Sequence, residues 1–124
     1  MNAIETVREI LTDRCIVLVG GDPRSPHLTR LKSAFRLREA LWVPTRDSDA
    51  SSKQFSSVIR GGNASLVVAL HGLLRHQHCR DIRELCRLLD VPLLAYWRTP
   101  HPAGLAAAIV ERRLIPLLQR RTAA

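Results

Sequence analysis

Short aliphatic runs alternate with segments of helical periodicity along this chain of 124 residues. The runs are shorter than ordinary helices and rich in Val, Leu and Ile, which favours strands. They are Cys15–Val19, Ala40–Val43, Ser65–Leu70 and Val91–Trp97. Strands that are apolar at nearly every position are typical of a parallel sheet covered on both faces.

The segments between these runs place apolar residues at helical spacing. We predict helices over residues 3–12, 28–35, 55–59, 79–89 and 103–118, with Pro116 bending or ending the last one. Strands that alternate with helices form right-handed βαβ units. We therefore predict one Rossmann-like three-layer α/β domain over residues 1–124. Its four parallel strands, numbered along the chain, lie in the order 2-1-3-4 with helices on both faces.

In such a sheet a ligand binds beyond the carboxyl ends of the strands, where the strand order reverses. Here that point lies between the first and third strands. Gly20-Gly21 would turn the chain sharply and expose N–H groups, and the helix that follows would add its positive end. The predicted ligand-binding residues are Gly20, Gly21, Arg24, His27, His71 and His76. Alternatively, the two glycines merely close a tight turn.

These residues predict a non-catalytic binding or sensing domain for a phosphate-bearing small molecule, such as a nucleotide. The sequence has no Gly-x-Ser-x-Gly elbow and no evident pair of carboxylates, so we do not expect an enzyme. No cofactor or metal is predicted, because the His and Cys residues near position 78 lack zinc-site spacing. We expect Cys79, Ile82 and Cys86 on one apolar helix face, with His78 pointing elsewhere.

A formal net charge of +8 supports a second hypothesis, in which the chain binds nucleic acid or an acidic protein partner. Its residues would be Arg80, Arg83, Arg87, Arg112 and Arg113. Glu84 is spaced to form ion pairs with Arg80 and Arg87, which would neutralise part of this stripe. A homodimer, formed through an exposed sheet edge or a surface that includes Trp97, is a further alternative.

The three cysteines, Cys15, Cys79 and Cys86, lie in apolar segments and suggest no disulfide framework. The first residues lack a basic stretch followed by an apolar one, and no apolar run reaches the roughly 20 residues of a membrane span. We therefore expect a cytoplasmic protein without membrane contact.

The sequence also resembles the bacterial domain-of-unknown-function family numbered 2325. The resemblance rests on the strand and glycines Ile16–Gly21, the strand Leu66–Leu70, then His76, Ile82, Cys86 and the pair Val91-Pro92. It covers about residues 14–109. It implies a compact Rossmann-like domain in bacteria with no established activity. The Pro-containing loop Asp22–Pro26 and the arginine-rich surface depart from the family's pattern.

Overall fold

A four-stranded parallel sheet forms the centre of the computed structural model, which describes residues 1–45, 52–61, 63–70 and 76–123. Its order is β2-β1-β3-β4, which confirms the predicted topology. The strands are β1 (Cys15–Val19), β2 (Glu39–Val43), β3 (Leu66–Leu70) and β4 (Leu93–Tyr96). β1 has the predicted bounds, β2 and β3 each differ by one residue, and β4 is three residues shorter than predicted. The switch in strand order therefore lies between β1 and β3.

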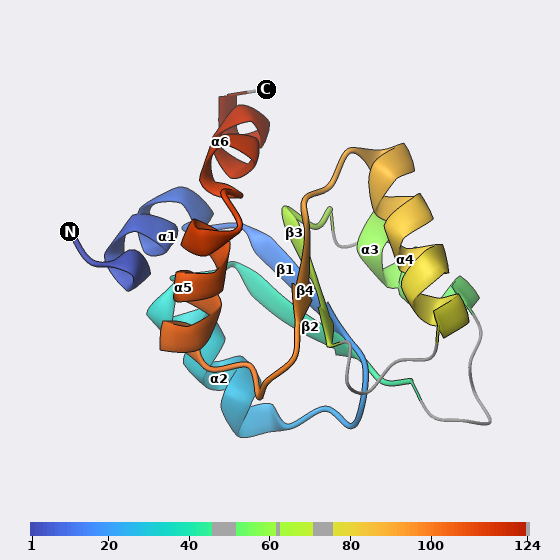
Figure 1. Ribbon diagram of the computed structural model, residues 1–124. Helices are drawn as coiled ribbons and strands as arrows, with labels where there is room; N and C mark the ends of the chain where they lie inside the picture. The colour runs from blue at the N-terminus through green and yellow to red at the C-terminus, as the bar shows by residue number, and fades with distance from the viewer. Residues whose placement is uncertain (46–51, 62, 71–75, 124) are drawn as a thin grey trace.

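Helices cover both faces of this sheet (Figure 1). One face carries α1 (Ala3–Leu11), α2 (Ser25–Ala34), α5 (Pro102–Glu111) and α6 (Ile115–Ala123). The other face carries α3 (Ser52–Gly61) and α4 (His76–Leu89). All strands point the same way, so the loops that leave their carboxyl ends meet at one edge, at the bottom of Figure 1.

The core is divided into two apolar clusters because successive strand residues point to opposite faces. Ile16 and Leu18 of β1 pack toward α1, α2 and α5, whereas Val17 and Val19 pack toward α3 and α4. All four side chains are at most 1% exposed. Burial of each such side chain contributes about 1.5–3 kcal/mol, so both faces of β1 stabilise the fold.

Four helices end in the same turn, in which a non-glycine residue adopts a left-handed conformation. These residues are Arg36 (φ 50°), Asn63 (φ 50°), Asp90 (φ 54°) and Arg113 (φ 57°). In each case the next residue donates its N–H to a carbonyl five residues earlier, as Leu114 does to Ile109 at 3.1 Å. This bond is the mark of a Schellman motif, which usually has glycine at the left-handed position.

The residue after each left-handed position is buried: Leu37, Ala64, Val91 and Leu114 are at most 8% exposed. Such an apolar residue anchors the chain to the core as it leaves the helix. This anchor holds the left-handed turn in place although arginine, asparagine and aspartate carry a side chain that opposes it.

The same turn corrects the prediction of one long helix over residues 103–118. The chain leaves α5 at Arg112, turns at Arg113, and begins α6 at Ile115. Pro116 lies in the first turn of α6, where its missing N–H costs nothing, so it starts a helix and does not end one. The second helix also begins earlier than predicted, at Ser25, because Pro26 likewise fits a first turn.

Replacing Arg113 by glycine should stabilise the protein, because glycine adopts the left-handed conformation without steric cost. We expect Arg113→Gly to raise the free energy of unfolding by about 1 kcal/mol. The matched control is Arg112→Gly, which removes the same charge at φ −82° and should lower stability. Urea denaturation of both variants tests this, and equal effects would contradict it.

The buried cysteines predict a loss of stability at alkaline pH. Burial raises the pKa of the Cys86 thiol from its ordinary value of 9.0 to about 11. The unfolded chain therefore loses this proton before the folded protein does. The stabilisation is complete below pH 9 and is lost as the pH rises toward 11.

The free energy of unfolding should fall with a slope of up to about 1.4 kcal/mol per pH unit in that range. Cys86→Ala should flatten this slope. Cys79→Ala, at a half-buried position, should flatten it less. Urea denaturation at several pH values measures the slope, and an unchanged slope in Cys86→Ala would contradict the assignment.

Candidate functional site

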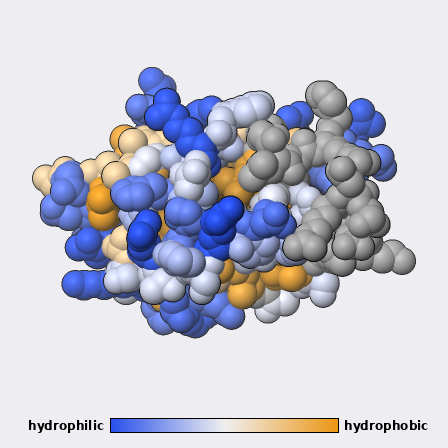
Figure 2. Space-filling model, turned by 90° about the horizontal axis from the view of Figure 1, so that it is seen from below, coloured by the Kyte–Doolittle hydropathy of each residue, from blue (hydrophilic) through white to orange (hydrophobic). Residues whose placement is uncertain are grey.

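A cavity of about 510 Å³ lies at the carboxyl edge of the sheet, on the face covered by α2 and α5. The chain segments that follow β1 and β4 supply most of its lining. The lining residues are Asp22, Arg24, His27, Trp42, Leu70, Tyr96, Trp97, Arg98, Thr99 and Pro100. Figure 2 views the molecule from this end and shows hydrophilic residues around smaller hydrophobic areas outside the grey atoms.

Gly20 and Gly21 form the tight turn beside this cavity. Both have positive φ, 128° and 65°, which explains why glycine occupies the two positions. The Gly20 N–H donates to the Val43 carbonyl at 3.0 Å, and the Gly21 N–H donates to Thr45 Oγ1 at 3.3 Å. Trp42 Nε1 in turn donates to the Gly20 carbonyl at 2.7 Å. The turn thus uses both N–H groups to join the end of β1 to the end of β2.

The start of α2 adds the side chains of Arg24, its N-cap residue, and of His27 in its first turn. Pro26 has no N–H, and the N–H groups of His27 and Leu28 both bond to the Arg24 carbonyl, at 3.0 and 3.3 Å. Few backbone donors therefore remain at this helix end, so the side chains are the available donors. The Nδ1 atom of His27 is buried and has no hydrogen-bond partner among the described residues. A buried polar atom without a partner is uncommon, so this ring nitrogen is a candidate donor or acceptor for a group outside the described residues.

The loop after β4 brings the remaining polar and aromatic groups. Trp97 is 67% exposed although it lines the cavity, and Arg98 is also exposed. Four further lining residues were not among the predicted site residues: Trp42, Tyr96, Trp97 and Arg98. The signal that could have identified the last two is their place directly after a strand of the same parallel sheet.

Two of the predicted ligand-binding residues have side chains outside the described part of the chain. His71 lies outside the described residues, as does the side chain of His76, whose backbone begins α4. Of the six predicted ligand-binding residues, the structure brings Arg24 and His27 into the cavity lining and places the two glycines in the turn beside them.

The basic residues of the second hypothesis lie elsewhere. Arg80, Arg83, Arg87, Arg112 and Arg113 are all exposed, on α4 and on the turn between α5 and α6. Arg87 forms an ion pair with Glu84 at 2.5 Å, one of the two predicted pairs. An exposed pair of this kind contributes little to stability.

The prediction for His78 was wrong. Its side chain is only 5% exposed and meets the ring of Phe55 edge-on, with ring centroids 6.3 Å apart. The helix begins earlier than predicted, so His78 lies one turn before Ile82 on the buried face. Cys79 is half-buried instead. Within the described ranges, no three His, Cys, Asp or Glu residues come together as metal ligands.

Comparison with protein-family models, with characterised proteins and with solved structures gave no match for this chain. The resemblance to the 2325 family therefore stays a prediction from its motif residues. In the part of the chain that the structure describes, no helix has the length and apolar composition needed to cross a bilayer.

Tyr96, which lines the cavity, lies close to Gly104 of α5, and this contact predicts an effect on stability. A methyl group added at Gly104 of α5 would lie 2.3 Å from Tyr96 Oη but 3.6 Å from Tyr96 Cζ. Gly104→Ala should therefore displace the buried Tyr96 ring and destabilise the protein by about 1–3 kcal/mol.

Removing the hydroxyl removes the clash. In a Tyr96→Phe background, Gly104→Ala should be neutral or stabilising by up to about 1 kcal/mol, since alanine favours helices. Thermal unfolding of the four proteins in this double-mutant cycle measures the coupling. Additive effects of the two changes would contradict the contact.

Proposed function

We propose that this protein binds a phosphate-bearing small molecule in the cavity at the carboxyl ends of β1, β3 and β4, as a binding or sensing domain. The observation that carries the proposal is the convergence on one cavity of Arg24 and His27, at the start of α2, and Arg98, after β4. Arginine and histidine are the usual side-chain donors to phosphate oxygens.

The electrostatics of the cavity favour an anion. Two guanidinium groups lie at its rim with one carboxylate, that of Asp22, so the described lining residues have a positive balance. His27 also lines the cavity, and an imidazole N–H can donate to a phosphate oxygen. We therefore expect side chains, and not the backbone N–H groups of Gly20 and Gly21, to contact the ligand. The two glycines shape the loop that carries Arg24.

The aromatic residues favour a nucleotide over a simpler phosphate. Trp97 lines the cavity and leaves two-thirds of its surface exposed. An indole in this setting can stack on a nucleobase, and stacking of this kind contributes about 1–3 kcal/mol per base. Trp42, the other indole of the lining, is held by its hydrogen bond to the Gly20 carbonyl.

A thermal-shift screen with nucleotides, sugar phosphates and inorganic phosphate tests the proposal, followed by calorimetric titration of each compound that raises the melting temperature. Arg24→Ala and Arg98→Ala should each weaken binding about tenfold or more, as expected when a charged hydrogen bond is lost. The matched control is Arg30→Ala, an exposed arginine of α2 that does not line the cavity.

Trp97→Ala separates the ligand classes. It should weaken nucleotide binding and leave the binding of inorganic phosphate unchanged. If no phosphorylated compound raises the melting temperature, the proposal fails. It also fails if Arg30→Ala weakens binding as much as Arg24→Ala does.

A further inference from the structure

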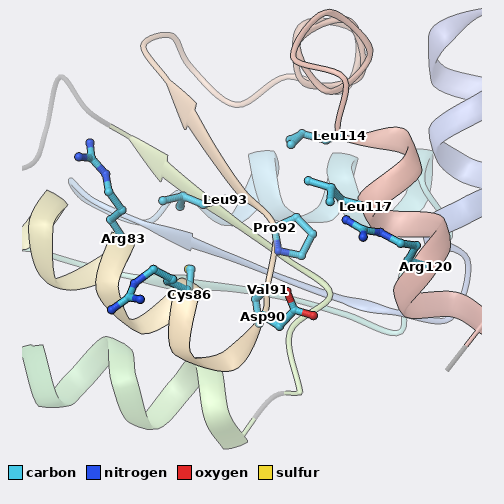
Figure 3. A pocket seen from close by; sticks show the side chains of 10 residues that line it. Arg83, Cys86, Asp90, Val91, Pro92, Leu93, Leu114, Leu117 and Arg120 are labelled. Atoms are coloured by element: carbon cyan, nitrogen blue, oxygen red, sulfur yellow. The ribbon is translucent and has the colours of Figure 1, made fainter.

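A second cavity, of about 520 Å³, lies at the opposite end of the molecule, beside the start of β4 (Figure 3). Two helices border it. On one side lie Arg83, Cys86 and Arg87 of α4. On the other side lie Leu117 and Arg120 of α6, together with Leu114 directly before that helix. Asp90 and the apolar residues Val91, Pro92 and Leu93 form the connection between these sides.

The backbone of β4 is open beside this cavity. The strand is the last in the sheet, and no described residue pairs with its outer edge. The Val67 N–H donates to the Pro92 carbonyl, so the N–H and C=O groups of Leu93 and Ala95 point away from β3. An exposed edge of this kind can pair with an added strand.

The side chains around the cavity are apolar apart from three arginines and the single carboxylate of Asp90, so the positive charges outnumber the negative one. Cys86, Val91 and Leu114 are at most 8% exposed and form an apolar floor. Arg83, Arg87 and Arg120 are exposed at its border. Arg87 forms an ion pair with Glu84. The guanidinium groups of Arg83 and Arg120 take no part in that ion pair.

We propose that the outer edge of β4 binds an extended acidic segment of a partner protein as an additional strand. Its backbone would pair with Leu93 and Ala95, its apolar side chains would enter the cavity, and its carboxylates would contact Arg83 and Arg120. Charge complementarity and the open backbone edge together identify this occupant.

Two other occupants fit the same surface less well. A second copy of this chain would bring the same arginines of both copies together, and each copy carries a net charge of +8. Single-stranded nucleic acid would need aromatic side chains for base stacking, and the lining residues that the structure describes include none.

The test uses a capped fluorescent peptide, Glu-Glu-Val-Val-Glu-Glu, which presents valine and glutamate on both faces of a strand. Fluorescence anisotropy with the full chain should show binding that weakens with salt. The same peptide with lysine in place of glutamate should bind at least about tenfold more weakly. Methylation of the two valine nitrogens should abolish binding, because it removes pairing donors and blocks close approach of the strands.

Charge-matched variants locate the site. Arg83→Glu combined with Arg120→Glu should weaken peptide binding by at least about tenfold. Arg30→Glu combined with Arg60→Glu makes the same change of charge on α2 and α3 and should have little effect. Chemical shifts of the Leu93 and Ala95 amide protons should move on titration.

Three results would overturn the proposal. The first is equal binding of the methylated peptide, which would exclude strand pairing. The second is equal loss of affinity in both pairs of variants. The third is displacement of the peptide by oligothymidylate, or formation of a dimer that Arg83→Glu disrupts, either of which would assign the surface to another occupant.

Discussion

The parallel pairing of β1 with both β2 and β3 is the constraint on which the rest of this structure depends. In this register, Val17 lies opposite Leu41 on one side and Val67 on the other. The pairing satisfies the backbone groups of a strand that is buried on both faces, where unpaired groups would be costly. It also requires the carboxyl ends of the strands to lie at one edge. The loops that carry Arg24 and Arg98 therefore meet there, although 74 residues separate them in the sequence numbering.

The sheet could be predicted because its signal is local and repeated. Each strand is a run of aliphatic residues, and alternation with helical segments restricts the topology to a few arrangements. Helix ends were harder to predict. The expected signal for a helix end is glycine, but here Arg36 and Arg113 take the left-handed position. The decisive contact is the burial of the next residue, Leu37 or Leu114, and burial depends on the tertiary structure.

Only part of the candidate site could be predicted from the sequence. Topology placed the loop after β1 at the carboxyl edge, and Arg24 and His27 do line the cavity. It could not show that Val43 and Thr45 accept the hydrogen bonds of Gly20 and Gly21, because those acceptors come from the end of another strand. Nor could the sequence show that Tyr96 packs against Gly104, a contact that depends on the approach of α5 to β4.

The two cavities show why net charge alone does not identify a partner. Both have arginines at the border, and both adjoin β4, one at each end of the strand. The cavity after Tyr96 adds indole rings and a histidine nitrogen, which suit a small anionic ligand with a flat ring. The cavity before Leu93 adds aliphatic side chains and an open backbone edge, which suit a peptide. The groups beside the arginines, and not the charge of +8, therefore distinguish the two proposed ligands.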